Sequence, residues 1–223
     1  TNDVVLDGGA GGVQFNSTGD GQTTARDLTV NSNVTSTVSF ANTLGANGLI
    51  RNLTVNSGII SATSDLLSQG NVTLIANTRN VNGADLQGQG QLTIAPFTAN
   101  STYTPTLGTI GDGFSSITIG NAATGTVNLS GFTASNPVTV IGAHINLQGA
   151  IDGAFDLTLT SSGVTRLQGT IGATTALNSI TTDATGSLQL LGGTIATNNG
   201  AIIFNDPVTL GANTIVEAVS GAI

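Results

Sequence analysis

The residues that could carry catalysis in this chain are a few carboxylates, and the closest pairs in sequence are Asp3 with Asp7 and Asp152 with Asp156. Polysaccharide lyases and hydrolases use two converging carboxylates, and lyases add a basic residue or bound calcium. Arg166 is the cation nearest to the second pair. All four aspartates stand beside turn glycines or at strand starts, where aspartate commonly satisfies the backbone. We therefore predict no catalytic residue and expect a protein that is not an enzyme.

A glycine-rich N-terminal segment could in principle hold calcium. The runs DGGAGG at 7–12 and GDG at 19–21 are similar to the turns of calcium-binding β-roll repeats, in which aspartate and backbone carbonyls hold the ion. The candidate ligands are Asp7, Asp20 and Asp112. The segment lacks the aspartate that the nonapeptide repeat requires, and it does not recur. Ordinary glycine turns explain it, and we predict no metal and no cofactor.

One histidine and two aromatic residues complete the candidate site residues. His144 precedes Ile145, whose side chain is expected to point inward, so the imidazole should point outward with no second ligand for a metal. Phe97 and Tyr103 lie in an irregular stretch and could form a small stacking platform for a surface glycan. The alternative is that these aromatics pack down onto the neighbouring structure.

The composition excludes several classes of function. Lysine is absent, the only cations are four arginines, and the net charge is −8, so nucleic-acid binding is not expected because it needs clustered cations. Without cysteine there is no disulfide, zinc–thiolate site or thiol catalysis. No apolar run approaches the roughly 18 residues of a membrane span, so no membrane insertion is expected. The start of the chain has neither methionine nor an apolar signal core, and we expect a piece of a longer polypeptide.

Short repeats must position all of these side chains. The phrase RDLTVNS at 26–32 returns as RNLTVNS at 51–57, a step of 51 − 26 = 25 residues. Looser copies follow, each an alternating strand with glycine, asparagine or serine at its end. They include NVTLIA from Asn71, QLTIA from Gln91, SITIG from Ser116, TVNLSG from Thr126, PVTVIG from Pro137, HINLQG from His144, DLTLTS from Asp156, SLQLLGG from Ser187 and PVTLGA from Pro207. Such a unit cannot bury its apolar face alone, so the copies are expected to stack.

The repeat spacing favours a parallel solenoid over an antiparallel sandwich. If each repeat is one coil, Thr29 lies over Thr54 and Asn31 over Asn56, whereas a sandwich has no reason to repeat a phrase at that interval. We predict an all-β fold, a single β-solenoid over residues 1–223 with about ten coils. The irregular run from Ala95 to Pro105 indicates a protruding loop, or a seam between two repeat blocks, near 95–115.

Two segments resemble a known class of proteins. Residues 111–151, with SITIG, TVNLSG, PVTVIG and HINLQG, and residues 157–217, with SLQLLGG and PVTLGA, resemble the repeats of filamentous-haemagglutinin-like bacterial exoproteins, adhesins often exported by two-partner secretion. The resemblance implies a right-handed parallel β-helix outside the cell that serves adhesion, aggregation or fibre formation. The Asn-Pro-Asn-Gly-like turns of their secretion domain are not found here, so the chain is interpreted as a repeat region. No functional residue is carried over.

The expected function is therefore that of a non-enzymatic, extracellular structural and adhesive repeat segment at a bacterial cell surface, forming a stiff rod or fibre. Residues 215–223, IVEAVSGAI, show no polar cap, which favours self-association end to end or stacking on further repeats of the same polypeptide. Surface glycans are the other expected partner. The alternatives are a carbohydrate-active β-helix enzyme and a calcium-stabilised glycan-binding module.

Overall fold

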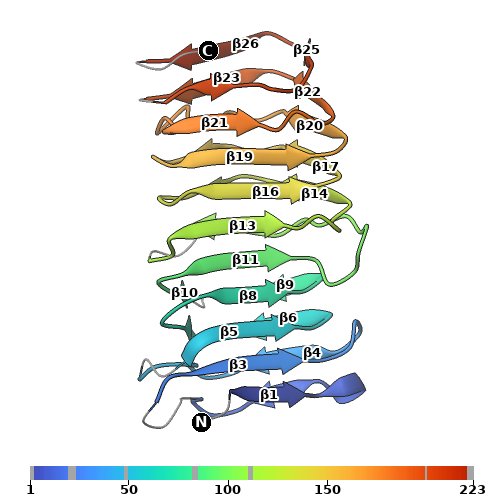
Figure 1. Cartoon of the computed structure of the whole chain (residues 1–223), viewed down its shortest axis with the longest axis vertical. Coiled ribbons are helices and arrows are strands. Elements are labelled where there is room, and N and C mark those ends of the chain that lie inside the picture. Colours follow the sequence, from blue (N-terminus) through green and yellow to red (C-terminus); the bar gives the residue numbers. More distant parts are fainter. Residues whose placement is uncertain are drawn as a thin grey trace. The chain divides into compact units, whose positions relative to one another are not determined.

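The chain folds as an all-β solenoid in which parallel strands stack in about ten coils (Figure 1). The computed structural model describes residues 3–19, 24–47, 50–81, 85–109, 113–198 and 200–219. These residues form two compact units, one of residues 1–98 with 111–117 and the other of residues 99–110 with 118–223. Strand β13 (Ser116–Gly120) contains residues of both units. The predicted parallel β-solenoid is confirmed.

In the first unit each coil contributes a strand to up to three faces, joined by turns. The first face consists of β1 (Val4–Asp7), β3 (Arg26–Asn31), β5 (Ile50–Asn56), β8 (Val72–Ile75) and β11 (Gln91–Ala95). The second face consists of β2 (Val13–Phe15), β4 (Thr37–Phe40), β6 (Ile59–Ala62) and β9 (Thr78–Asn80). The third pairs β7 (Leu66–Leu67) with β10 (Leu86–Gln87), and a short 3-10 helix, η1 (Gly9–Gly11), lies between β1 and β2.

The second unit repeats this plan. Its first face consists of β16 (Val138–Gly142), β19 (Asp156–Ser161), β21 (Ser179–Thr182) and β24 (Ile202–Ile203). Its second face consists of β14 (Thr126–Leu129), β17 (His144–Leu147), β20 (Val164–Leu167), β22 (Ser187–Leu190) and β25 (Val208–Leu210). The third contains β12 (Gly108–Thr109), β15 (Phe132–Thr133) and β18 (Ile151–Asp152), followed by the pair β23 (Gly193–Thr197) and β26 (Thr214–Ala218). Within each unit the coils wind right-handed, the usual hand of parallel crossovers (Figure 1).

The strand register places like residues over like residues. Thr29 pairs with Thr54 and Asn31 with Asn56, as the repeat predicts, and the Asn56 amide donates to the Asn31 side-chain oxygen at 2.9 Å. The register shifts near the start of these strands, because Arg26 pairs with Ile50 whereas Leu28 pairs with Leu53. The two arginines of the repeated phrase are therefore not register partners, although the residues after them are.

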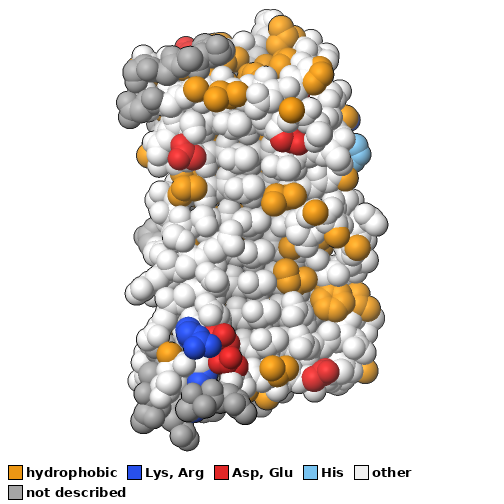
Figure 2. Space-filling model, in the orientation of Figure 1, with side chains coloured by type: hydrophobic (Ala, Val, Ile, Leu, Met, Phe, Trp, Pro, Cys, Tyr) orange, Lys and Arg blue, Asp and Glu red, His pale blue; other side chains and the backbone are white. Residues whose placement is uncertain are grey.

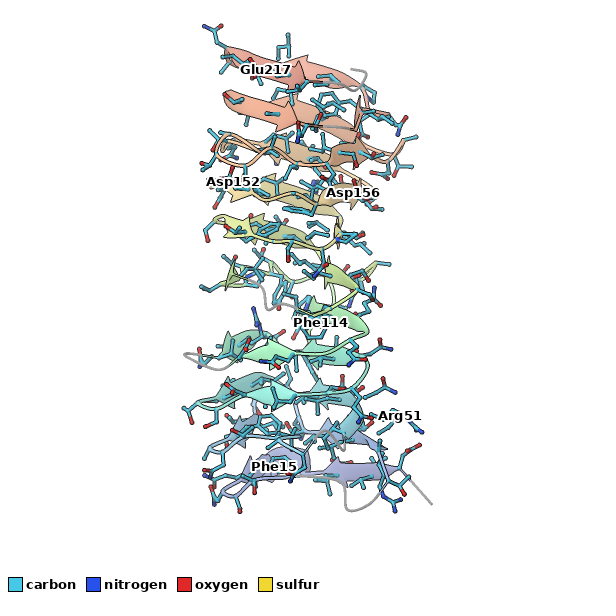
Figure 3. All side chains as sticks on the ribbon, turned by 90° about the vertical axis from the view of Figure 1, so that its left-hand side faces the viewer. Phe15, Arg51, Phe114, Asp152, Asp156 and Glu217 are labelled. Carbon is cyan, nitrogen blue, oxygen red and sulfur yellow. The ribbon has the colours of Figure 1, made fainter. Side chains whose placement is uncertain are left out.

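The core is a column of aliphatic side chains that point inward from every face. Because alternate residues of a strand face opposite sides, Leu53 and Val55 are fully buried while Thr54 between them is only half-buried. Burying such a side chain contributes about 1.5–3 kcal/mol. Phenylalanines also contribute to the core. Phe40 and Phe155 are 1% exposed, and Phe40 stacks on Phe15 with ring centroids 4.9 Å apart; Phe15 is labelled in Figure 3.

The turns bring backbone from successive coils into close contact, and some positions accept only glycine. Gly45 has φ +79°, and a Cβ there would lie 2.1 Å from the carbonyl oxygen of Leu67 in the next coil. Serines inside the turns are satisfied by their neighbours: the hydroxyls of Ser32 and Ser57 lie 2.7 Å apart in the interior. None of the helices in the described ranges has the length and apolar character needed to traverse a lipid bilayer.

Candidate functional site

The first pair of carboxylates considered for catalysis accepts hydrogen bonds from backbone and side-chain groups of the solenoid coils. Asp3 accepts hydrogen bonds from the Arg51 guanidinium at 3.0 Å and from the Asp27 backbone N–H at 3.1 Å, whereas Asp7 accepts from the N–H of Gly9 at 2.9 Å. Arg51 also lies 2.8 Å from Asp27, and its hydrogen bond lowers the pKa of Asp27 below its usual value. Arg51, Asp3 and Asp27 form a charged cluster on the surface of the first unit, and Figure 2 shows blue and red side chains in contact on that part of the chain.

The two carboxylates of the second pair, Asp152 and Asp156, also bond to different partners. Asp152 accepts the backbone N–H groups of Thr174 and Thr175 at 2.8 and 3.1 Å, and Asp156 accepts the Ser179 hydroxyl. Arg166 bonds to side-chain amides and to neither aspartate. The structure therefore does not assemble the acid, base and cation that glycan cleavage would need from these residues.

The calcium candidates do not form a coordination site in the described part of the chain. Asp7 serves the η1 turn through Gly9, while Asp20 and Asp112 lie outside the described residues. Nowhere in the described ranges do three His, Cys, Asp or Glu side chains gather in a way that could hold a metal ion.

The expected glycan platform involves one buried and one half-buried ring. Tyr103 is 2% exposed and its backbone bridges to Val127, so its ring packs into the second unit and presents no face to a sugar. Packing onto the coil, the alternative considered from the sequence, describes this residue. Phe97 is half-buried, and a glycan contact there stays a prediction. His144 is exposed as expected, and its Nδ1 accepts the N–H of Val164 at 2.9 Å.

The most unusual feature of the second unit is its last described coil, β24 to β26. Each of these strands is the final strand of its sheet, so along one edge their backbone N–H and C=O groups have no partner strand among the described residues. Strand edges of this kind are templates for pairing with another strand. In Figure 3 this coil is marked by Glu217, an exposed residue of β26. We call the exposed edges and side chains of β24–β26 the open end.

The open end also exposes side chains that belong to the core in every coil below. Leu188 and Leu190 of β22 are 0% and 2% exposed, but their register partners in β25, Val208 and Leu210, are 44% and 73% exposed. On β26 the core position is Val216, which is half-buried although its register partner Ile195 is 1% exposed. The alternation of Val208, Thr209 and Leu210 predicts that both aliphatic side chains share the inward face, and no coil among the described residues covers them.

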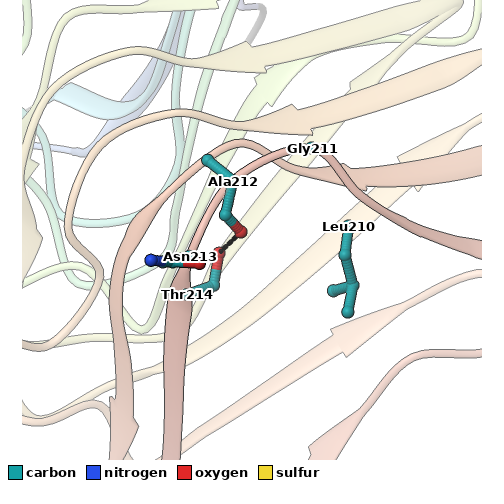
Figure 4. Close-up of a pocket in the computed structure, with 5 residues that line it drawn as sticks. All are labelled: Leu210, Gly211, Ala212, Asn213 and Thr214. Carbon is teal, nitrogen blue, oxygen red and sulfur yellow. Dashed lines mark hydrogen bonds between the residues drawn. The ribbon is translucent and has the colours of Figure 1, made fainter.

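A shallow hollow lies in the turn between β25 and β26. It has a volume of about 530 Å³ and is lined by Leu210, Gly211, Ala212, Asn213 and Thr214 (Figure 4). Its polar groups serve the turn, since the Thr214 hydroxyl donates to the Ala212 carbonyl at 3.3 Å. No charged side chain lines the hollow, so its chemistry suits a covering strand better than a small polar ligand.

The first unit ends in a comparable way at its N-terminal coil. Strands β1 and β2 are terminal in their sheets, and the core-facing Val4 of β1 is 39% exposed. Leu6, Val13 and Phe15 of the same coil are half-buried rather than buried. The side chains of this coil therefore have neighbours on one side only among the described residues.

Asp206 is the site residue that sequence reasoning missed. It lies between β24 and β25 with 5% of its surface exposed, and neither carboxylate oxygen makes a hydrogen bond of normal geometry to a described residue. Burial raises the pKa of Asp206, the nearby Thr182 hydroxyl partly opposes this, and Asp183 raises the pKa further. Nothing in the run NDPVTL signals that this aspartate turns inward.

No protein-family model, curated protein or solved structure matches this chain.

Proposed function

We propose that this chain is a non-enzymatic, extracellular structural and adhesive repeat segment of a bacterial surface protein, and that its open end stacks on a further β-coil. One observation carries the proposal: in a single coil, three strand edges have no partner strand among the described residues, and core-type side chains are exposed. An added coil would pair the free backbone groups and cover Val208 and Leu210 in one step. Both contributions are those that already hold each coil to the next.

A second copy of the chain offers a suitable coil. Its β1 and β2 present free parallel edges and half-exposed aliphatic side chains, which match the order of faces at the open end. Contact between two different ends is heterologous, and it propagates unless a rotation closes it into a ring. Repeated stacking of this kind would build the stiff surface fibre expected for such a segment.

The enzyme and calcium-module alternatives have no comparable support. Among the described carboxylates that they would use, Asp7 and Asp152 bond to backbone N–H groups, Asp156 to Ser179 and Asp3 to Arg51. An adhesive role through presented outer faces is consistent with the bonding of these side chains within the coil.

Stacking is tested by placing a charge at the open end. Leu210→Asp puts an unpaired carboxylate where a second coil would cover it, so we expect association of the chain to weaken strongly in sedimentation velocity. Val34→Asp is the matched control, because Val34 is 47% exposed but lies in the turn between β3 and β4 of the first unit. A wild-type chain that stays strictly monomeric at high concentration, or equal association of both variants, would contradict stacking at this end.

A further inference from the structure

A row of polar side chains crosses the solvent-facing side of the five-stranded sheet β14-β17-β20-β22-β25 in the second unit. Its members stand in register on neighbouring strands, each between two inward-facing residues. They are Asn128 on β14, Asn146 on β17, Arg166 on β20, Gln189 on β22 and Thr209 on β25. We call this set the Arg166 row.

The hydrogen bonds along the row run outward from Arg166, which donates to a side chain on each neighbouring strand. The Asn146 amide donates to the Asn128 side-chain oxygen at 2.7 Å, and Arg166 Nη1 donates to the Asn146 oxygen at 3.3 Å. On its other side, Arg166 Nε donates to the Gln189 oxygen at 3.1 Å. The amide oxygens of Asn128, Asn146 and Gln189 are thus all engaged within the row.

The groups left over are donors. Arg166 carries five N–H bonds, of which the row engages one on Nε and one on Nη1, and neither N–H of Nη2 has a described partner. The Gln189 amide nitrogen likewise makes no hydrogen bond to a described residue. Acceptor capacity also remains on the amide oxygens and on the exposed Thr209 hydroxyl, but the unengaged N–H groups of Arg166 and Gln189 are complementary to a ligand rich in oxygen acceptors.

Arg166 also makes no ion pair with a carboxylate of a described residue. It is the sole Lys or Arg among residues 99–110 and 118–223, and no described carboxylate lies within ion-pair distance of it. The guanidinium fork matches a carboxylate with two parallel hydrogen bonds. A densely charged polyanion is disfavoured, because the chain carries a net charge of −8 and this face offers one cation.

The neighbouring positions suit the hydroxyls of a sugar. His144 is exposed on β17, and since its Nδ1 accepts the Val164 N–H, the neutral ring presents a donor at Nε2. Gln148 and Gln168 are exposed immediately after β17 and β20. Imidazole and amide groups on an open strand face can bond hydroxyls along an extended ligand.

We propose that the Arg166 row binds a saccharide chain that carries isolated carboxylates among neutral hydroxyl groups. Arg166 takes the carboxylate through Nη1 and Nη2, and Gln189 and His144 donate to neighbouring sugar oxygens. The inference deepens the adhesive role proposed above and rests on it, but it places glycan contact on β17–β22 and not at Phe97 and Tyr103.

The probes are a hyaluronan hexasaccharide, in which uronates alternate with neutral sugars, and chitohexaose, which has no carboxylate. Binding to the full chain is measured by calorimetry and by the NMR signals of the four arginine Nε–H groups. We expect hyaluronan to shift the Arg166 signal and leave the Arg51 signal in place. Arg166→Gln should weaken hyaluronan binding by about tenfold or more, because a charge-assisted bidentate contact is lost. Arg166→Lys should have an affinity between those of the wild type and Arg166→Gln, because it keeps the charge but loses the bidentate geometry.

The matched control is Arg51→Gln, which removes the same charge from a guanidinium already paired with Asp3 and Asp27 and should leave hyaluronan affinity unchanged. Equal affinity of wild type and Arg166→Gln, or equal affinity for chitohexaose, would overturn the proposal. The NMR shift on the wild-type chain requires no variant to fold. Sedimentation of the same samples separates the two ideas: association without uronate binding refutes only this inference, and uronate binding by a strictly monomeric chain refutes only stacking.

Discussion

At the scale of single residues, polar side chains in this chain serve the backbone, and Asp206 is the exception. Most aspartates accept hydrogen bonds from a nearby turn or coil, as Asp152 does from Thr174 and Thr175. Asp206 is buried and its carboxylate has no such partner among the described residues, and a buried charge without a hydrogen-bond partner costs stability. Its burial is a liability of the last described coil.

We therefore predict that Asp206→Asn stabilises the chain at neutral pH by on the order of 1 kcal/mol, because the amide carries no charge to bury. Burial raises the pKa of Asp206 above the ordinary value of 3.8, so the folded chain binds the proton more tightly than the unfolded chain. Below pH 3.8 the Asp206 carboxyl is protonated in both the folded and the unfolded chain, so it lowers the free energy of unfolding least there. The free energy of unfolding then falls as the pH rises through the pKa of the folded state. Thermal melts across pH should show the variant's advantage vanish in acid. An advantage of equal size at all pH values would contradict this account.

At the scale of elements, the strands follow directly from alternation, but the turns depend on contacts between coils. Leu28, Val30, Leu53 and Val55 point inward, as any strand with that pattern must. The one-residue shift between Arg26 and Leu28 could not be predicted, because it arises where β3 and β5 begin and leaves the repeated phrase unchanged. Asp206 was missed for the same kind of reason, since its burial depends on the coil below.

The turn argument predicts that Gly45→Ala destabilises the chain by about 1–3 kcal/mol, since alanine would need a positive φ and its Cβ would meet the Leu67 carbonyl. Gly11→Ala is the control, because a Cβ there meets nothing within 4 Å. Chemical denaturation of both variants measures the difference. A Gly45→Ala chain as stable as the Gly11→Ala chain would show that the turn relaxes without cost.

At the scale of the whole molecule, charge opposes the association that the open end favours. The chain carries −8 and contains just four cations, so copies repel each other at low ionic strength. Stacking driven by aliphatic burial and strand pairing should therefore strengthen when salt screens the repulsion. Sedimentation velocity at low and high salt measures this. Association that weakens with added salt would indicate contacts made by ion pairs and would count against the open end.

The amino-acid sequence by itself determined the parallel solenoid, the inward aliphatics and the stacked threonines and asparagines, because a side-chain period of two and a repeat of coil length leave few other ways to bury the apolar faces. It also excluded thiol chemistry and clustered cations. Only the tertiary structure decided that Tyr103 is buried, that Asp152 and Arg166 serve different partners, and that Leu210 is exposed. The burial and hydrogen-bond partners of a residue depend on the coils above and below it, and the sequence of one repeat does not determine which side chains those coils contribute.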